Sequence, residues 1–512
     1  MTDNDFVSQT SRRRGGDGKP PADPSGPAAA SNSPVSSGPS ERPATPGSWR
    51  LAALGILAGG VVAGALIEDK RLRKLLPAVT AGVALGFAVP IALASRKPPI
   101  SPEKAADALE TSSDPPTFTV LVGARDEANV LPTLVADVSR QDYRDSSGRP
   151  LFELVVVDDR SNDGSGQAVR TAAKACGIAA VTRVVRREGE NLPDGKGAAL
   201  TAAQPSVCRG DVVLVLDADA RIEPHFLRTA AGYFAAGARA VTARRCILDA
   251  GSGWLAGAQA DEQTLDGELN RGRWAMGGCS EFRGNGIMVR RDLLEAAGGW
   301  RAAALCEDID LSARVAATSG DRVVWAIDAE VWEEPVRSVG GLWRQRSRWA
   351  EGALRRAFEH GPAVVRSDKL PVAARVDFAT YVAQLAVPPM VLGAAAASVA
   401  TGRKRGLLML LSGYLGISAA LAWDSLRWEC QPDGQPLGTG QRIGRALRVT
   451  FFNGIWLLVV PRALLDLIIR RGPIRYVKME HDGQGLNGRD AGLDGRDEGS
   501  AGSAGSAEVA DK

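Results

Sequence analysis

The sequence has little surplus charge of either sign. Its 62 Lys and Arg residues are nearly balanced by 59 Asp and Glu, so a formal charge of only +3 is spread over 512 residues. Proteins that bind nucleic acid usually carry a clear basic surplus on one face. Nucleic acid is therefore not an expected partner.

Closely spaced cysteines are also lacking. The six cysteines are Cys176, Cys208, Cys246, Cys279, Cys306 and Cys430. Zinc sites and disulfide frameworks rely on short, regular cysteine spacings such as CxxC. Neither is predicted, and most of these cysteines are expected to be small buried residues in a reducing compartment.

An apolar run next to the first residue is missing as well. The first such run begins only at Leu51, too far along the chain for a usual signal peptide. Residues 1–48 are rich in Pro, Ser, Gly and Ala, and residues 471–512 in Gly, Asp and Ser. Segments of this composition cannot bury enough apolar surface to fold, so both are predicted to be disordered tails.

Five apolar runs approach the length that crosses a bilayer. They cover residues 51–67, 75–94, 378–400, 406–423 and 449–469. A spanning helix needs about 20 apolar residues. These runs predict a transmembrane helical hairpin over 49–96 and transmembrane helices over 377–470. Arg462 lies well inside the last run, so it faces a polar cavity or this run is not a simple span.

Between the second and third runs the composition is that of an α/β domain. A linker is expected over 97–115, the domain over 116–349 and amphipathic interfacial helices over 350–376. Strands are predicted at 117–122, 152–157, 180–185, 211–216 and 238–243. Continuous apolar runs suit strands covered on both faces, as in a parallel sheet, where ligands bind beyond the carboxyl ends.

Acidic residues directly follow two of these strands. Asp217-Ala218-Asp219 could hold a divalent cation, which offsets the charge of a diphosphate leaving group. Asp158 and Asp159 could accept hydrogen bonds from a nucleobase and ribose, although one of them could instead cap the next helix. Because both pairs follow strands, they are expected to face one crevice.

Three further elements complete the candidate site. Lys196 lies in a glycine-flanked loop that lets phosphate oxygens approach, although such a loop by itself is more often only solvated. Glu307 and Asp308 precede a helix start; Asp308 is the candidate general base, and helix capping is the alternative.

Gln345, Arg348 and Trp349 form the third element. Arg348 could stabilise a diphosphate and Trp349 could stack on a sugar ring. The alternative is an ordinary Arg and Trp pair at a membrane interface.

These features occur together in the order of a known family. The shared residues are Ala124-Arg125-Asp126-Glu127, Val157-Asp158-Asp159, Lys196, Asp217-Ala218-Asp219, Arg283-Gly284-Asn285-Gly286, Gly298-Gly299-Trp300, Glu307-Asp308 and Gln345-x-x-Arg348-Trp349. The segment from Thr117 to Gly352 resembles the catalytic domain of membrane-bound inverting family 2 glycosyltransferases, the group of cellulose, hyaluronan and poly-N-acetylglucosamine synthases. Cys306 stands where that family commonly has Thr.

The resemblance implies a GT-A fold, a Rossmann-like mixed sheet, between transmembrane helices. It implies a nucleotide-sugar donor such as a UDP-sugar, Mg²⁺ or Mn²⁺ held by Asp219 and Asp217, and catalysis through Asp308 with Glu307 and Arg348. The donor residues would be Ala124, Asp126, Glu127, Asp158, Asp159, Lys196 and Asp217. The acceptor would lie near Trp349, Gln345, Gly299 and Trp300.

The expected location is the cell membrane, with several spans and a cytoplasmic catalytic domain. The basic turns at 70–74 and 403–405 conflict with this, because the positive-inside rule would place them in the cytoplasm. Either the rule is overridden or some runs are re-entrant or interfacial.

Three functions fit the sequence. The main expectation is transfer of sugar to a growing polysaccharide, because the complete QxxRW element accompanies the acidic motifs. The alternative is transfer of a single sugar to a lipid carrier or isoprenoid-type lipid, because the C-terminal membrane part is short for a polymer channel. The third is a membrane protein that binds nucleotide sugar without turning it over.

Overall fold

The computed structural model describes residues 46–189, 192–204, 207–431 and 434–470. The predicted tails lie outside the described residues, apart from residues 46–48, where the first helix begins. The segment boundaries proposed from the sequence otherwise stay predictions.

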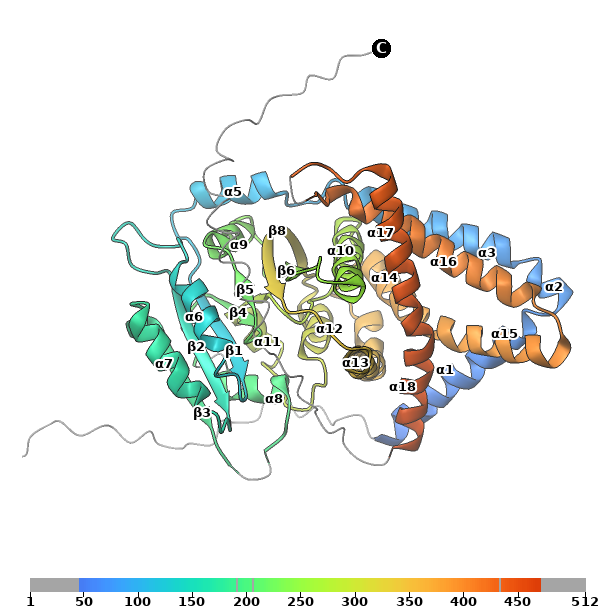
Figure 1. Ribbon diagram of the computed structural model, residues 1–512, viewed down its shortest axis with the longest axis horizontal. Coiled ribbons are helices and arrows are strands. Elements are labelled where there is room, and N and C mark those ends of the chain that lie inside the picture. Colours follow the sequence, from blue (N-terminus) through green and yellow to red (C-terminus); the bar gives the residue numbers. More distant parts are fainter. Residues whose placement is uncertain (1–45, 190–191, 205–206, 432–433, 471–512) are drawn as a thin grey trace, which may run out of the picture. The chain divides into compact units, whose positions relative to one another are not determined.

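One eight-stranded sheet forms the centre of the α/β domain, in the order β3-β2-β1-β4-β7-β6-β8-β5 (Figure 1). The strands are β1 (Phe118–Ala124), β2 (Phe152–Asp159), β3 (Thr182–Arg187), β4 (Val212–Leu216), β5 (Arg221–Ile222), β6 (Ala240–Ile247), β7 (Ile287–Arg290) and β8 (Val324–Glu333). The first four are parallel, whereas β7 runs antiparallel to β4 and β6. The expected mixed α/β sheet is therefore confirmed.

Helices cover both faces of this sheet. Around it lie α5 (Pro102–Glu110), α6 (Leu131–Ser139), α7 (Ser165–Ala175), α8 (Lys196–Leu200), α9 (Phe226–Ala235), α10 (Trp254–Ala275), α11 (Arg291–Ala296) and α12 (Glu307–Ser319). Alternate strand residues point to opposite faces. Val120 and Val122 pack in one core with α6, α7 and α9, while Leu121 packs in a second with α8, α11 and α12. Burial on both sides explains why a central strand such as β4 is apolar along its whole length.

The remaining α-helices precede or follow the α/β domain in the chain. They are α1 (Pro46–Leu66), α2 (Lys70–Arg73), α3 (Leu76–Val83), α4 (Val89–Ala94), α13 (Val339–Arg366), α14 (Val372–Ala383), α15 (Val387–Thr401), α16 (Arg405–Ser425), α17 (Thr439–Phe452) and α18 (Trp456–Ile469). Five stretches of them are long and apolar enough to cross a membrane: Trp49–Leu66, Lys70–Ala94, Val372–Thr401, Arg405–Trp428 and Thr439–Ile469. These overlap the five runs expected from the sequence.

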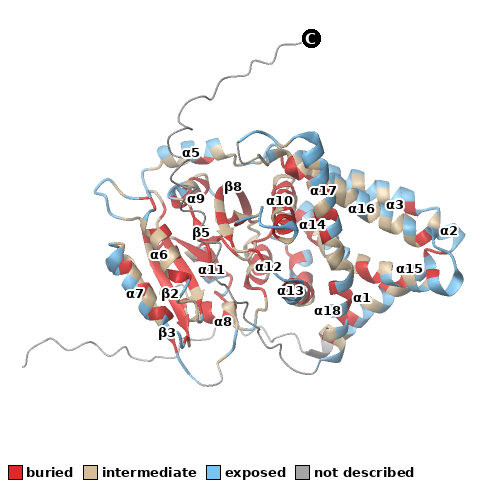
Figure 2. Cartoon of the chain, in the orientation of Figure 1, coloured by how far each residue is buried: buried red, intermediate tan, exposed pale blue. Residues whose placement is uncertain are grey.

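Much of the outer side of these helices is exposed (Figure 2), and many of the exposed residues there are large and apolar. Leu51 is 74% exposed, Leu85 70% and Val399 88%. An extended exposed apolar surface is unfavourable in water and suits contact with lipid. On the inside, α1 and α15 approach closely at Gly64 and Gly393, where an added Cβ would meet the backbone of Met390 and Val61. Small residues permit this close packing of membrane helices.

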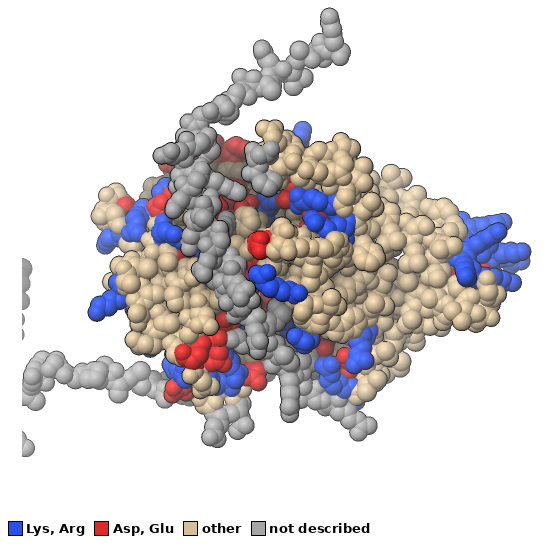
Figure 3. Space-filling view, viewed as in Figure 1, with Lys and Arg blue, Asp and Glu red and all other residues tan. Residues whose placement is uncertain are grey.

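The two basic turns lie at the same end of these helices. The buried Glu68 accepts hydrogen bonds from the Leu407 backbone N–H (2.9 Å) and from the Ser398 hydroxyl (3.2 Å). This joins the turn after α1 to the turn before α16. Lys and Arg side chains accordingly gather at one end of the molecule, beyond a broad band with few charges (Figure 3).

The last apolar run is not one straight helix. A 3-10 turn at Asn453–Ile455 separates α17 from α18. Arg462 and Asp466 lie one turn apart on α18 and Arg470 follows the end of the helix; the Arg462 side chain is 61% exposed, and both arginines pair with Asp466. A charged stripe on an apolar helix is typical of the membrane interface. Of the two alternatives for Arg462, the structure favours a segment that is not a simple span.

Two further segments differ from the expectation. The linker contains α5, which begins where the Ser101 hydroxyl accepts a hydrogen bond from the Lys104 N–H. In addition, α13 continues without a break through position 349. The expected boundary at 349/350 therefore falls inside a helix.

Candidate active site

Lys196 brings three of the predicted site elements together. Its ammonium group donates to Asp217 Oδ1 (2.5 Å) and to the Gly284 carbonyl (2.8 Å), and lies 3.4 Å from Glu307 Oε1. Burial alone would lower the pKa of Lys196, but the carboxylates of Asp217 and Glu307 outweigh it, so its pKa lies above the ordinary value. Lys196 is thus a permanent cation at the centre of an acidic cluster.

Asp308 and Glu307 occupy the first turn of α12, as predicted. Asp308 Oδ2 accepts a hydrogen bond from the Gly284 N–H (2.7 Å). Glu307 is buried, and burial raises its pKa despite the neighbouring Lys196. The same Gly284 therefore contacts Lys196 through its carbonyl and Asp308 through its N–H.

Asp217 and Asp219 follow β4 directly. The Asp217 N–H donates to Asn285 Oδ1 (3.1 Å), and Asp219 Oδ2 accepts from the Glu334 N–H (3.4 Å). The Asp217 side chain is 36% exposed, whereas Asp219 is only 5% exposed as a residue. Two carboxylates at this strand end are oxygen ligands of the kind that Mg²⁺ and Mn²⁺ prefer, so the residues present fit a divalent cation.

Asp158 and Asp159 are each paired with an arginine of the neighbouring strand. Arg186 donates to Asp158 Oδ2 and Arg187 to Asp159 Oδ1, both at 2.7 Å. Asp158 Oδ1 also accepts from the Ser161 N–H (3.2 Å), which is the turn-capping role given as the alternative. Both carboxylates are held in fixed orientations at the carboxyl end of β2.

The expected donor residues after β1 lie beside this pair. Ala124 is aligned with Asp158 in the sheet. Asp126 has a positive φ of 53°; its carboxylate accepts from the Asn162 N–H (2.7 Å), and the Glu127 N–H donates to Ser165 Oγ (2.8 Å). The loops after β1 and β2 therefore support each other.

Gly299 and Trp300 lie on the core side of the domain. Gln204 bonds to both backbone groups of Trp300, and a Cβ on Gly299 would meet Gln204 Oε1 at 2.2 Å. Trp300 is 2% exposed and packs in the second core. Its ring therefore has little surface to offer an acceptor.

The QxxRW residues lie on α13, which packs against α12. Gln345, Arg348 and Trp349 are all partly exposed. The guanidinium of the intervening Arg346 lies 4.0 Å from the centroid of the Trp349 ring and pairs with the carboxylate of Glu262. The ring is thus in contact with a protein cation.

Arg245 is a residue that the sequence reasoning missed. Its Nε and Nη2 form a bidentate pair with Glu333, and Nη1 lies 4.0 Å from the position of a Cβ on Gly284. Its guanidinium also lies 5.6 Å from the Trp349 centroid. Burial alone would lower the pKa of Arg245, but the carboxylates of Glu333, Asp217 and Asp308 outweigh this effect, so its pKa lies above the ordinary value. The signal was available as a double arginine at the end of a predicted strand.

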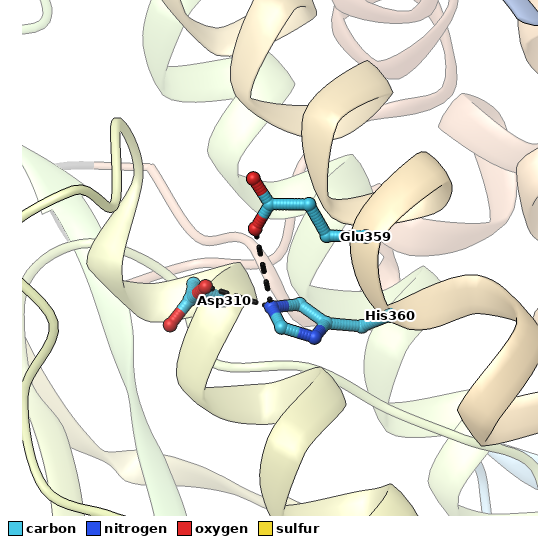
Figure 4. A group of neighbouring side chains, drawn as sticks. All are labelled: Asp310, Glu359 and His360. Carbon is cyan, nitrogen blue, oxygen red and sulfur yellow. Dashed lines mark hydrogen bonds and ion pairs between the residues drawn. The ribbon is translucent and has the colours of Figure 1, made fainter. Parts of the chain in front are cut away.

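Another cluster joins α12 to α13. The ligand atoms of Asp310, Glu359 and His360 lie within 4.8 Å of one another (Figure 4). Arg301 Nη1 lies 2.8 Å from Asp310, 3.2 Å from Glu359 and 2.9 Å from His360 Nε2. A guanidinium already supplies the positive charge here, so this is an ion-pair network that holds two site-bearing helices together.

Comparison with known proteins identifies the domain. Residues 115–352 match the family model described as glycosyltransferase like family 2. These residues form a glycosyltransferase family 2 domain. A beta-monoglucosyldiacylglycerol synthase of Trichormus variabilis is 26% identical over 383 residues, covering 72% of this chain and 77% of that protein. Another from Synechocystis is 27% identical over 376 residues, covering 72% and 75%.

A solved mannosyltransferase of Pyrobaculum calidifontis, in complex with GDP-Man and Mn²⁺, covers 83% of this chain and 100% of its own, with a TM-score of 0.49 and 21% identity. The expected GT-A fold and a glycosyltransferase activity are confirmed. The resemblance is confirmed for family 2 but not for the cellulose, hyaluronan and poly-N-acetylglucosamine synthase group specifically, because the relatives reported above are named beta-monoglucosyldiacylglycerol synthases.

Proposed function

We propose that this protein is an inverting glycosyltransferase that moves one hexose from a nucleotide diphospho-sugar to the hydroxyl group of a membrane lipid. The observation that carries the transferase part is the convergence on Gly284, which contacts the Lys196 ammonium on one side and the Asp308 carboxylate on the other. A phosphate-binding cation and a candidate base are thus held by one residue.

Asp308 is the proposed general base. The Gly284 N–H fixes Oδ2, which leaves Oδ1 to take the proton of the acceptor hydroxyl as that oxygen attacks the anomeric carbon. Attack opposite the leaving diphosphate inverts the anomeric centre. Glu307, whose raised pKa reflects its burial, is proposed to position Lys196 rather than to exchange protons with substrate.

The donor is proposed to lie across the carboxyl ends of β1, β2 and β4. Asp158 and Asp159, oriented by Arg186 and Arg187, would accept hydrogen bonds from the nucleoside. Lys196 and Arg348 would neutralise the diphosphate. Asp219 and Asp217 would hold Mg²⁺ or Mn²⁺, which supplies charge stabilisation for the leaving diphosphate.

A lipid acceptor is favoured over the polysaccharide that was the main expectation. Both relatives reported above are named as synthases of a monoglucosylated diacylglycerol. The membrane-capable helices pack directly on the helices of the domain, as α4 and α16 do on α10. A diacylglycerol-like lipid carries a single free hydroxyl, and transfer to it requires no channel for a growing chain. We propose a membrane location with the domain on the cytoplasmic side, where nucleotide sugars are made.

The test uses the full-length protein in lipid vesicles with Mg²⁺ or Mn²⁺. A panel of radiolabelled nucleotide sugars is supplied with diacylglycerol, and products are separated into lipid-extractable label, polymer and free sugar. We expect label in the lipid fraction, and a fall of about 10²-fold or more with Asp308→Asn while donor binding persists. Label in polymer would instead support the transfer of sugar to a polysaccharide. Donor binding without transfer, unchanged in Asp308→Asn, would leave the non-catalytic binder.

A further inference from the structure

Large apolar side chains are exposed where α10 and α13 begin and α17 ends. Trp254 is 51% exposed and Phe451 78%; on the first turns of α13, Val339 is 74% exposed and Trp343 38%. The Trp254 ring packs edge-on against Phe451, with the centroids 6.0 Å apart. Together these four residues are called the aromatic patch below. Exposure of this much aromatic and apolar surface in one place indicates a binding partner or lipid.

The patch rests on one buried cluster. Ala258 of α10, Leu342 of α13 and Phe452 of α17 pack together there. Trp254 also packs against Phe452, at 6.2 Å between ring centroids. The three helix ends therefore share one buried apolar cluster, and Trp254 and Phe451 pack together next to it.

From this cluster a line of contacts leads to the candidate active site. The Phe452 ring lies 5.7 Å from the guanidinium of Arg346, which in turn lies 4.0 Å from the Trp349 ring. Leu342, Arg346 and Trp349 are spaced by four and three residues, so they share one face of α13. Beyond Trp349, the Arg245 guanidinium lies 5.6 Å away, and both Arg245 Nη1 (4.0 Å) and Asp308 Oδ2 (3.9 Å) lie near the position of a Cβ on Gly284.

The patch is also continuous with a membrane-capable segment. Phe451 belongs to the candidate span Thr439–Ile469, on which Leu447 (59%) and Leu458 (65%) are exposed as well. Arg337 and Arg344, next to Val339 and Trp343, are exposed cations. Apolar and aromatic residues bordered by basic ones fit the level at which a bilayer changes from acyl chains to anionic head groups.

We propose that the aromatic patch seats the apolar chains of the lipid acceptor, while its hydroxyl-bearing end extends along α13 to Trp349 and Asp308. This inference rests on the proposed function and adds the route by which the lipid leaves the bilayer. It also assigns the patch a role other than general attachment, because four further segments outside the patch are long and apolar enough to cross a bilayer. General attachment would not depend on the chains of the acceptor.

The test compares acceptors that differ only in their chains. Transfer to dioleoylglycerol and to the soluble dihexanoylglycerol is measured in vesicles for the native protein, for Trp254→Ala/Phe451→Ala and for the control Val399→Ala. Val399 is the matched control because it is 88% exposed on α15. For the double variant we expect KM for dioleoylglycerol to rise about tenfold, which corresponds to the loss of apolar contact area. KM for the donor and transfer to dihexanoylglycerol should be unchanged.

The outcomes separate this inference from the proposed function. If the native protein glycosylates lipid but the double variant loses activity equally with both acceptors, or loses none, the patch does not seat the chains.

A second experiment applies if the native protein makes no glycolipid. The proposed function then fails, and the patch is tested by a photoreactive diacylglycerol. The crosslinked adduct should map to α10 or α17. Its yield should fall when dioleoylglycerol is added as a competitor, and no adduct should form in the double variant. If phosphatidylcholine lowers the yield of adduct as much as dioleoylglycerol does, the patch is a general lipid surface and the inference is overturned.

Discussion

Lys196 Nζ lies 3.4 Å from Glu307 Oε1, so the first residue of α8 is tied to the first residue of α12. Both side chains are largely buried, at 15% and 8% exposure. Burying an ion pair costs desolvation energy. Substituting only one of the two residues leaves the other charge buried without a partner and is therefore strongly destabilising. The pair therefore couples the position of α8, which carries the proposed phosphate-binding Lys196, to that of the proposed base, Asp308.

Lys196→Met should lower the free energy of unfolding by about 3 kcal/mol, because it leaves Glu307 buried without its cation. The measurement is the unfolding of the detergent-solubilised protein. Lys196→Met/Glu307→Gln is the matched control, since it removes both charges; it should recover at least half of the loss. If the losses of the two single variants simply add in the double variant, the pair is not energetically coupled.

Removal of divalent cations should abolish transfer. Asp217 and Asp219 supply the carboxylates proposed to hold the ion, and a chelator should therefore stop turnover until Mg²⁺ or Mn²⁺ is added back. Asp219→Asn should raise the metal concentration needed for half-maximal activity about tenfold, because a neutral amide binds a divalent cation more weakly. Glu359→Gln is the control: Glu359 belongs to the Arg301 cluster, and its substitution should leave the metal titration unchanged. A shift with Glu359→Gln instead would place the ion in that cluster.

Asp310 should make the protein sensitive to acid. Burial would raise its pKa, but the hydrogen bond with His360 and the charges of Arg314 and Arg301 outweigh it and lower the pKa to about 2. A carboxyl group whose pKa falls on folding stabilises the fold above its unfolded pKa of about 4, and this contribution disappears as pH falls from about 4 to about 2. The difference in unfolding free energy between the native protein and Asp310→Asn should be about 2 kcal/mol larger at pH 5 than at pH 2. A difference that does not change with pH would contradict this coupling.

The sequence predicted those parts of the fold that depend on local patterns. Short β-branched runs predicted β1, β2, β3, β4 and β6, and a continuous apolar run such as Leu154 to Val157 also indicated a strand covered on both faces. Three strands were not predicted. β5 has two residues and β7 four, and β8 alternates acidic with apolar residues because one of its faces is only partly buried. Their pairing depends on contacts far apart in the chain.

The candidate site was predictable in its residue types but not in its contacts. Asp217, Asp308 and Lys196 stand out by their positions after strands or before a helix, yet nothing in their spacing places Gly284 between Lys196 and Asp308. A double arginine after a predicted strand marks Arg244 and Arg245 in the sequence, but the pairing of Arg245 with Glu333, 88 residues later in the chain, could not be read from it. Long-range pairs of this kind are visible only in the folded structure.

The close contact between α12 and α13 gives a last test. A Cβ on Gly352 of α13 would lie 2.4 Å from Cys306 Sγ and 2.9 Å from Cys306 Cβ. Cys306 directly precedes Glu307 and Asp308, so Gly352→Ala should push the start of α12 away from Trp349. We expect kcat to fall about tenfold and the free energy of unfolding by about 2 kcal/mol, a typical cost of overpacking.

Without this clash the same substitution would be favourable, because Ala stabilises a helix interior by about 1 kcal/mol over Gly. Cys306→Gly removes both clashing atoms, and glycine is tolerated at a helix N-cap. Cys306→Gly/Gly352→Ala should therefore regain most of the lost kcat, whereas Cys306→Ala, which leaves the Cβ in place, should restore less. Gly340→Ala in the first turn of α13 meets only the flexible end of Arg344 at 3.7 Å and should leave kcat unchanged. If Gly352→Ala is as active as Gly340→Ala, the spacing between the two helices is not what positions Asp308.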